Sequence, residues 1–288
     1  MSLSNNPLVS VILPVYNAEN YIYLSVHSIL KQKYTNFELI IINDGSTDNT
    51  LNIINSFNDE RIRIINRENK GLVYSLNEGI AVSNGMYICR MDADDISSPQ
   101  RISAQIEIFL DNPSVDFIFS DVSLIDDDGN YVCEAWIGKN TEEVIDRIEW
   151  LNTIYHPSIM FKKNLINSYG NYNKKDNIYE DKDLWLRFKE NNVNFFYLKQ
   201  NLLHYRLCKT SIHSNYTNYW FSVANACVVN RNRKLAYKYL SKLSMKHKLN
   251  IIVKTLIPEF LLLPLIKLKN NRKSKKSWKR KYLLLVPG

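Results

Sequence analysis

The sequence predicts an α/β protein whose central sheet is mostly parallel and flanked by helices. Apolar runs of strand length alternate with amphipathic helical segments along the first 120 residues. The run at residues 37–42 is rich in β-branched residues and lacks polar alternation, which is typical of a strand covered on both faces. Polar or acidic loops follow four of these runs, at the edge where open α/β sheets bind ligands.

The elements of the first half follow from local patterns. Residues 9–13 form an apolar run that Pro14 closes. The helix expected after it, at residues 20–32, has its apolar stripe at Ile22, Val26 and Ile29. We expect further strands at residues 37–42, 62–65, 87–91 and 115–120, and further helices at residues 48–57, 72–83 and 99–110.

After residue 121 the alternation is less regular. The run Asp126–Asn130 predicts a hairpin turn. We expect a short helix at residues 142–150, short strands at 159–161 and 194–198, and a helix between those strands at 180–191. From residue 217 onward the pattern is helical.

Composition restricts the class of protein. The chain has 288 residues, of which 45% are hydrophobic and 23% charged, and this suits a soluble globular protein with one large domain or one domain and an appendage. Its four cysteines show no metal-site spacing, which favours free thiols in a reducing compartment. No charged-then-apolar signal sequence opens the chain, so we expect a cytoplasmic protein.

The basic character belongs to the C-terminal tail. The net charge is +8, and residues 267–281 contain nine Lys or Arg and no acid, so the remainder carries about −1. A nucleic-acid-binding domain would carry such charge on its folded face, so we expect no nucleic-acid partner.

Residues 249–268 are apolar but too often interrupted by charge and proline for a spanning helix. Together with the basic run, they predict a segment that lies on the anionic inner face of the plasma membrane. The alternative is a helix packed on the domain with a solvated tail.

Three carboxylates, Asp92, Asp94 and Asp95, end the strand expected at residues 87–91. Unpaired charges are costly to bury, so we expect them at the ligand-binding edge. Asp92 and Asp94 are two residues apart, and on an extended backbone they would point the same way. Two convergent oxygen ligands suit Mg²⁺ or Mn²⁺, with a phosphate completing the coordination shell. The alternative is a solvated acidic turn that caps the next helix, and Asp95 in particular fits that role.

Three further loops lie at the same edge. Tyr16 could stack on a base, while Asn17 and Glu19 could cap the following helix or bind a ligand. Asp44 could accept a hydrogen bond from a ribose hydroxyl or a base N–H, although turn chemistry is certainly part of its role. Lys70 could contact a phosphate or could be a solvated loop lysine. Four such loops facing one crevice indicate a shared ligand.

Four motifs, at residues 9–17, 42–48, 69–79 and 91–95, resemble those of the family-two glycosyltransferases, which are inverting enzymes with the GT-A fold. Residues 179–187 resemble the family's Glu-Asp signature, in which the second acid is the catalytic base. The resemblance implies a glycosyltransferase domain at residues 1–215, with a nucleotide-binding half at 1–121 and an acceptor-binding half at 122–215. It leaves residues 216–288 as a helical region with the basic tail.

The resemblance also implies roles for individual residues. Asp181 would be the base and Glu180 its neighbour, while Asp94 would bind the metal and Asp92 would lie by the ribose and diphosphate. The alternative for the acid pair is a favourable first helical turn, where the macrodipole also predicts that Asp181 stays ionised at neutral pH. The candidate nucleotide-sugar-binding residues are Pro14, Tyr16, Asn17, Glu19, Asp44, Lys70, Asp92, Ala93 and Arg206, and the candidate metal ligands are Asp94, Asp92 and His213.

One position departs from the family pattern. Tyr205 and Arg206 match a Tyr-Arg motif, but Cys208 stands where a histidine that helps the metal or the diphosphate would be expected. His213 could substitute, although it is about equally a plain surface histidine, or the site could use aspartates and phosphate oxygens alone. His156 lies where an acceptor pocket could form, and a loop before a strand explains its position equally well.

These residue types suit direct displacement at the anomeric carbon of a sugar. A divalent metal would neutralise the leaving nucleoside diphosphate, and Asp181 would take the proton of the acceptor hydroxyl. We expect a nucleoside-diphosphate sugar as donor. The resemblance to the family implies a UDP-sugar. We expect a glycan or lipid-linked hydroxyl as acceptor, as in bacterial surface polysaccharide synthesis.

The alternative enzyme is a nucleotidyltransferase acting on a sugar phosphate. Residues 14–19 contain neither the glycine nor the basic residue that a triphosphate-binding loop would need, which counts against it. A non-enzymatic protein would leave Asp92, Asp94 and Asp181 without a role.

Overall fold

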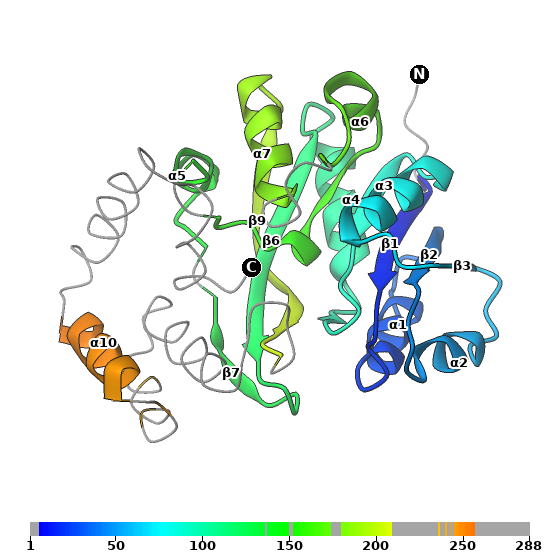
Figure 1. Cartoon of the computed structure of the whole chain (residues 1–288). Helices are drawn as coiled ribbons and strands as arrows, with labels where there is room; N and C mark the ends of the chain where they lie inside the picture. The colour runs from blue at the N-terminus through cyan, green and yellow to red at the C-terminus, as the bar shows by residue number, and fades with distance from the viewer. Residues whose placement is uncertain are drawn as a thin grey trace.

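The computed structural model describes residues 6–135, 137–149, 152–173, 180–208, 236, 240, 243 and 245–256. Within them, a nine-stranded sheet has the order β3-β2-β1-β4-β8-β6-β9-β5, with β7 paired to β6 (Figure 1). The strands are β1 (Val9–Val15), β2 (Phe37–Asp44), β3 (Ile62–Arg67), β4 (Tyr87–Arg90), β5 (Ile96–Ser97), β6 (Phe117–Ile125), β7 (Tyr131–Glu134), β8 (Met160–Lys162) and β9 (Phe195–Arg206).

Most of these strands run the same way. β1 pairs in parallel with β2 and β4, and β2 pairs in parallel with β3. β8 is antiparallel to both β4 and β6, so β6 runs in the direction of β4, and β9 is parallel to β6. The short strands β5 and β7 are antiparallel to their neighbours. The prediction of a mostly parallel α/β sheet is therefore confirmed.

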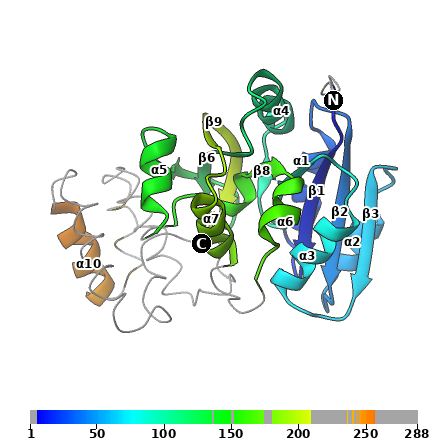
Figure 2. The ribbon, with the colours of Figure 1, turned by 90° about the horizontal axis from the view of Figure 1, so that it is seen from above.

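Helices cover both faces of the sheet. In Figure 2, α3 (Leu72–Val82), α6 (Asn164–Tyr169) and α7 (Glu180–Glu190) lie on one side of the sheet, and α4 (Arg101–Asp111) lies on the other. Close packing of α3 requires Gly79, because a Cβ atom there would lie 2.6 Å from Cγ2 of Ile12 on β1. The remaining helical elements are α1 (Ile22–Leu30), α2 (Thr50–Asn55), α5 (Thr141–Arg147), the 3-10 turn η1 (His156–Ser158) and α10 (Met245–Leu256).

The carboxyl ends of the parallel strands bring the predicted loops to one edge. Val15 pairs with Asn43 and Asp44 pairs with Arg67, so the loops after β1, β2 and β3 begin side by side. The N–H of Met91, directly after β4, donates a hydrogen bond to β1 (3.0 Å), which places the acidic loop (residues 92–95) next to them. The candidate site lies at this edge, as open α/β sheets predict.

The largest difference from the predicted elements is β9. The strand predicted to end at residue 198 continues to Arg206, because pairing with β6 and β5 persists beyond the polar residues 199–201 that interrupt the apolar pattern. Residue 121, the predicted boundary between the two halves, lies inside β6, so both halves contribute to one sheet. The division into domains stays a prediction.

The predicted C-terminal helical region lies mostly outside the described residues, and so does the basic tail. α10 is helical as predicted. None of the described helices is both long enough and apolar enough to cross a membrane.

Candidate active site

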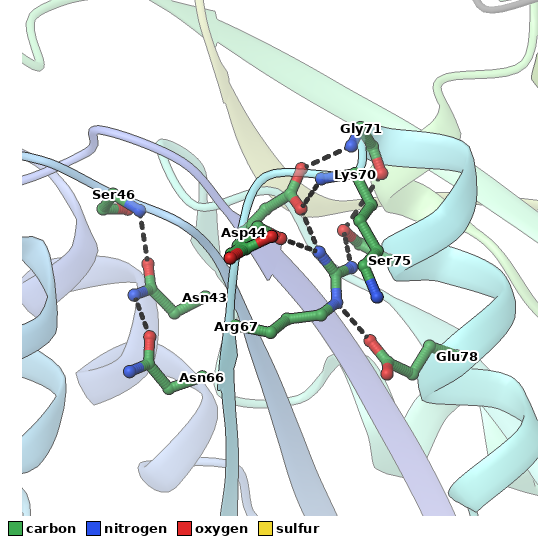
Figure 3. A network of polar contacts seen from close by, with 10 residues as sticks. Asn43, Asp44, Ser46, Asn66, Arg67, Lys70, Gly71, Ser75 and Glu78 are labelled. Atoms are coloured by element: carbon green, nitrogen blue, oxygen red, sulfur yellow. Dashed lines mark hydrogen bonds and ion pairs between the residues drawn. The ribbon is translucent and has the colours of Figure 1, made fainter.

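Asp44, at the end of β2, fastens the loop between β3 and α3 (Figure 3). Its carboxylate accepts hydrogen bonds from the backbone N–H groups of Lys70 (2.8 Å) and Gly71 (2.9 Å) and forms an ion pair with Arg67. Arg67 in turn donates to Glu78 on α3 (2.6 Å). The turn role predicted for Asp44 is therefore present, while its contact with a nucleoside stays a prediction.

The loop after β1 is held by the loop after β2. Asn17 has a positive φ of 48°, and its Oδ1 accepts a hydrogen bond from the N–H of Thr47 (2.8 Å). Glu19 accepts from the N–H of Asn49 (2.9 Å), and the N–H of Glu19 donates to Asp48 (3.1 Å). Asn17 and Glu19 thus hold the loop after β1, where Tyr16 is predicted to stack on a base, against the loop after β2.

The other residues predicted around the nucleotide differ in exposure. Tyr16 is 51% exposed, so its ring is accessible for stacking on a planar ligand. Pro14 is buried within β1. Lys70 is exposed, and its Nζ lies 4.9 Å from the centroid of the Tyr74 ring. Nucleotide contacts by Tyr16, Pro14 and Lys70 stay predictions.

The three carboxylates after β4 converge, although the backbone there is not extended. Residues 93–94 form a turn, so the extended geometry predicted for Asp92 and Asp94 is wrong. The turn nevertheless gathers the side chains: one oxygen of each of Asp92, Asp94 and Asp95 lies within 4.8 Å of the other two. Ala93, in the same turn, is partly buried and packs against the hydrophobic core.

Asp95 is not the solvated capping residue of the alternative prediction. It is 1% exposed, and its Oδ1 accepts a hydrogen bond from the backbone N–H of Arg206 (2.7 Å). Its Oδ2 is buried and has no hydrogen-bond partner among the described residues. The third carboxylate therefore belongs to the interior of the site.

The charge of the acidic loop is incompletely balanced. Arg90, buried at the end of β4, forms an ion pair with Asp92. Burial, and then the charge of Asp92, raises the pKa of Asp94 to about 6. Burial, and then the charges of Asp94 and Asp92, raises the pKa of Asp95 well above its usual value. A bound cation would relieve the repulsion that causes these shifts.

The acidic loop fits a hard divalent cation such as Mg²⁺ or Mn²⁺. Its three convergent side chains offer only carboxylate oxygens, which these ions prefer, and the buried Oδ2 of Asp95 has no donor in the part of the chain that the structure describes. The other predicted ligand, His213, lies outside the described residues.

The end of β9 contacts the acidic loop. Arg206 is buried, and its Nε donates to the carbonyl oxygen of Asp94 (2.7 Å). The Sγ of Cys208 donates to Oδ2 of Asp94 (3.0 Å), and burial, followed by the charge of Asp94, raises the pKa of this thiol. Nε and Nη1 of Arg206 are directed at backbone carbonyl oxygens. The contact predicted between Arg206 and the nucleotide sugar stays a prediction.

Glu180 and Asp181 begin α7 and are both buried. The carboxylate of Asp181 accepts hydrogen bonds from Nδ2 of Asn152 (2.7 Å) and from the N–H of Lys182 (2.6 Å). Burial raises the pKa of Asp181, which is opposite to the direction expected from the helix macrodipole, while these two hydrogen bonds lower it. Burial, and then the charge of Asp181, raises the pKa of Glu180 to about 7.

Sequence reasoning missed part of the surroundings of this pair. Nε2 of His156 lies 2.7 Å from the hydroxyl of Tyr172, and Nδ1 of His156 lies 3.9 Å from Oε1 of Glu180. Burial, and then the charge of Arg90, lowers the pKa of His156 well below its usual value, so the ring is neutral. The sequence singled out His156, but Asn152 and Tyr172 carry no motif that could have indicated them.

Arg90 links the two acidic groups electrostatically. Its positive charge lowers the pKa values of Asp94 and Asp95 in the loop after β4. The same charge lowers those of Glu180 and Asp181 at the start of α7. The metal-binding candidates and the candidate base therefore both lie within reach of the charge of one buried arginine.

Residues 10–170 match the family model described as Glycosyl transferase family 2. The O-antigen biosynthesis glycosyltransferase WbnJ of Escherichia coli is 32% identical to this chain over 225 residues, which covers 76% of this chain and 87% of that protein. An uncharacterized glycosyltransferase of Haemophilus influenzae is 35% identical over 195 residues, which covers 64% of this chain and only 60% of that protein.

Two solved structures share the fold. The structure of S. aureus TarS 1-349 in complex with UDP-GlcNAc matches with a TM-score of 0.59 and 17% identity, over 94% of this chain and 91% of that chain. The mannosyltransferase PcManGT from Pyrobaculum calidifontis, in complex with GDP-Man and Mn²⁺, matches with a TM-score of 0.57 and 15% identity, over 95% of this chain and 77% of that chain. The GT-A fold predicted from the sequence motifs is thereby confirmed.

Replacing Glu180 with Gln should stabilise the protein at alkaline pH. The pKa of Glu180 in the fold is about 7, against an ordinary value of 4.5. The folded state therefore favours the protonated carboxyl group, whose contribution is complete below about pH 4.5 and is lost as the pH rises through about 7. Gln stays neutral, so the advantage of Glu180→Gln over the wild type should grow between about pH 5 and pH 8, by at most about 3 kcal/mol.

Thermal unfolding of both proteins at the two pH values measures this advantage. Glu190→Gln, an exposed position at the other end of α7, is the matched control and should show no growing advantage. A difference between Glu180→Gln and the wild type that does not change with pH would contradict the raised pKa.

Proposed function

The chain belongs to glycosyltransferase family 2, and we propose that it is an inverting, metal-dependent enzyme that transfers a sugar from a UDP-sugar to a hydroxyl group. The proposed acceptor is a glycan or a lipid-linked saccharide of a bacterial surface polysaccharide. The E. coli relative named for O-antigen biosynthesis supports this class of acceptor. The fold that the chain shares with proteins solved with UDP-GlcNAc and with GDP-Man supports a nucleoside-diphosphate sugar as donor.

The arrangement of two acidic groups around Arg90 carries the proposal. The first group, Asp92, Asp94 and Asp95, is partly exposed and follows β4, where a diphosphate and its metal would bind. A buried pair, Glu180 and Asp181, begins α7. A sugar transfer needs these two functions next to each other: neutralisation of a leaving diphosphate and removal of a proton from an attacking hydroxyl.

Asp181 is the proposed general base. The hydrogen bonds from Asn152 and from the N–H of Lys182 fix its carboxylate, and burial raises its pKa toward the working pH. A base with a pKa below but near the working pH is deprotonated and still accepts a proton readily. Burial, and then the charge of Asp181, raises the pKa of Glu180 to about 7, so the pair is stabilised when it holds one proton between its two carboxyl groups.

Asp94 and Asp92 are the proposed metal ligands, with Asp92 also next to the ribose and diphosphate. A bound Mn²⁺ or Mg²⁺ would neutralise the charge that develops on the leaving diphosphate. The proposed nucleoside pocket lies between the loops after β1 and β2, where Tyr16 offers an exposed ring for the base. The Mn²⁺ in the PcManGT complex supports metal use in this fold.

The alternative activity, nucleotidyl transfer, lacks comparable support because the family model and these relatives are glycosyltransferases.

Asp181→Asn should remove sugar transfer while leaving UDP binding nearly intact. Asn keeps the size of the side chain but cannot take a proton, and general-base catalysis contributes roughly 100- to 10,000-fold to the rate. Turnover with a defined acceptor, together with calorimetric titration of UDP, measures both effects. Asp183→Asn, on the same helix but paired with Arg187 (3.1 Å), is the control and should retain near-normal kcat. A near-normal kcat in Asp181→Asn would move the base elsewhere, and a parallel loss of UDP affinity would assign the residue to donor binding or folding.

Asp94→Ala should abolish the dependence of UDP binding on metal. The substitution removes one of the convergent carboxylates, and a divalent ion then loses both a ligand and favourable charge. Titration of UDP with and without Mn²⁺ measures the dependence. Asp111→Ala, an exposed acid at the end of α4, should bind like the wild type. An unchanged Mn²⁺ effect in Asp94→Ala would exclude Asp94 from the metal site.

The proposed location is the cytoplasmic face of the plasma membrane. The support is the nine Lys or Arg within residues 267–281, each worth about 1 kcal/mol near an anionic surface. Replacing these nine residues with Gln should release the protein from anionic vesicles in co-sedimentation, and added salt should weaken binding of the wild type. The substitutions leave Ile251 of α10, which is buried, untouched. Equal pelleting of both proteins would show that the basic run is not the anchor.

A further inference from the structure

Arg206 makes a set of contacts that points away from the donor. We propose that Arg206 is a positioning residue: it holds the acidic loop, residues 92–95, in the conformation that binds the metal, and it does not contact the diphosphate. This inference rests on the metal-dependent donor binding proposed above.

The first observation is that Arg206 holds the acidic loop at two consecutive residues. Its backbone N–H donates to Oδ1 of Asp95 (2.7 Å), and its Nε donates to the carbonyl oxygen of Asp94 (2.7 Å). One contact fixes the side chain of Asp95 and the other fixes the backbone at Asp94, so together they restrain the turn at residues 93–94 and the residue that follows it. Pairing of β5 with β9, at Ile96 with His204, sets the register that brings them together.

The second observation is that the other side of the guanidinium group is anchored as well. Nη1 donates to the carbonyl oxygens of Asp126 (3.2 Å) and Asp127 (3.0 Å) in the turn between β6 and β7. The centre of the guanidinium lies 5.0 Å from the centroid of the Tyr21 ring, and the hydroxyl of Tyr21 donates to Asp127 (2.8 Å). The acidic loop is thus fastened through Arg206 to a hairpin turn and to a residue next to α1.

The third observation concerns what Arg206 has left to offer a ligand. It is 5% exposed, and its Nε and Nη1 are directed at three backbone carbonyl oxygens. An arginine that recognises a diphosphate presents a pair of donors to the ligand, either Nε with Nη2 or Nη1 with Nη2. In Arg206 one member of each pair, Nε or Nη1, is already hydrogen-bonded to the protein.

The loop needs such support because its charges repel one another. One oxygen of each of Asp92, Asp94 and Asp95 lies within 4.8 Å of the other two. Their negative charges repel one another until a cation is bound. Residues that orient metal ligands from behind typically contribute 10- to 100-fold to metal affinity. We therefore expect loss of the Arg206 side chain to lower the affinity for Mn²⁺ by about that factor.

The test compares Arg206→Met with the wild type, using the full chain. Met keeps an apolar stem, and the backbone N–H that reaches Asp95 is retained. Free Mn²⁺, followed by its paramagnetic resonance signal in the presence of UDP, gives the metal affinity. Calorimetry gives the UDP affinity with Mn²⁺ and in EDTA. The proposal predicts weaker Mn²⁺ binding, by about 10- to 100-fold, and unchanged UDP binding in EDTA.

Arg61→Met is the matched control. Arg61 also combines a carboxylate partner (Asp59, 2.7 Å), a backbone carbonyl (Leu30, 3.3 Å) and an aromatic ring (Phe37, 4.4 Å), but it lies at the opposite end of β3 from the site. It should lose thermal stability without loss of Mn²⁺ affinity. If Arg206→Met fails to fold, Arg206→Lys, which keeps the charge but not the planar fork, should show a smaller loss of Mn²⁺ affinity and normal UDP binding in EDTA.

Three outcomes overturn the proposal. A loss of UDP affinity that persists in EDTA would make Arg206 a direct ligand of the diphosphate. Wild-type Mn²⁺ affinity in both Arg206 variants would show that the loop needs no such support. If the wild type itself binds UDP equally with and without Mn²⁺, the proposed metal-dependent function fails, and this result is separate from the behaviour of the variants.

Discussion

The buried guanidinium group of Arg90 is the positive charge on which both acidic groups of the site depend. It pairs with Asp92 in the loop after β4, and its charge lowers the pKa values of Glu180 and Asp181 at the start of α7. Carboxylates removed from water are strongly destabilised unless an opposite charge is close. Arg90, on the central strand β4, thus lowers the cost of burying Asp95 in the loop and the acid pair at the helix start.

Even with Arg90, the acidic groups remain short of positive charge. The pKa values of Asp94, Asp95, Glu180 and Asp181 are all raised, and burial is the first cause in each case. A cation bound at the acidic loop would stabilise such a site, and so would a proton held by the acid pair at the start of α7. Both features suit an enzyme that must neutralise a leaving diphosphate and accept a proton in the same step.

Several acids that the motifs associate with a ligand are first of all structural. Asp44 fastens the loop between β3 and α3, Glu19 fastens the loop after β2, and Asp95 receives the backbone of Arg206. These contacts make the site a set of mutually supported loops. The end of β9, which comes from the predicted acceptor-binding half, supports the loop that carries the metal-binding candidates of the nucleotide-binding half. The two halves predicted for donor and acceptor binding therefore share one continuous sheet.

The sequence by itself determined the α/β class, most of the strands and helices before residue 121, and the edge of the sheet where the site lies. This information is local, because hydrophobic periodicity and the polar loops after each strand are read within a few residues. The helix predicted at residues 180–191 likewise placed Asp181 at a helix start, as the structure shows.

Only the tertiary structure decided which polar groups are buried and which partners they meet. Arg206 and Asp94 are 112 positions apart, and Asn152 and Asp181 are 29 apart, so no local pattern could pair them. The upward pKa shift of Asp181 was missed for the same reason: the helix macrodipole is a local property, whereas burial depends on everything that packs around the helix. Local patterns thus indicated where the candidate site lies. Long-range packing determined which of its residues hold the loops together and which are left accessible to a ligand.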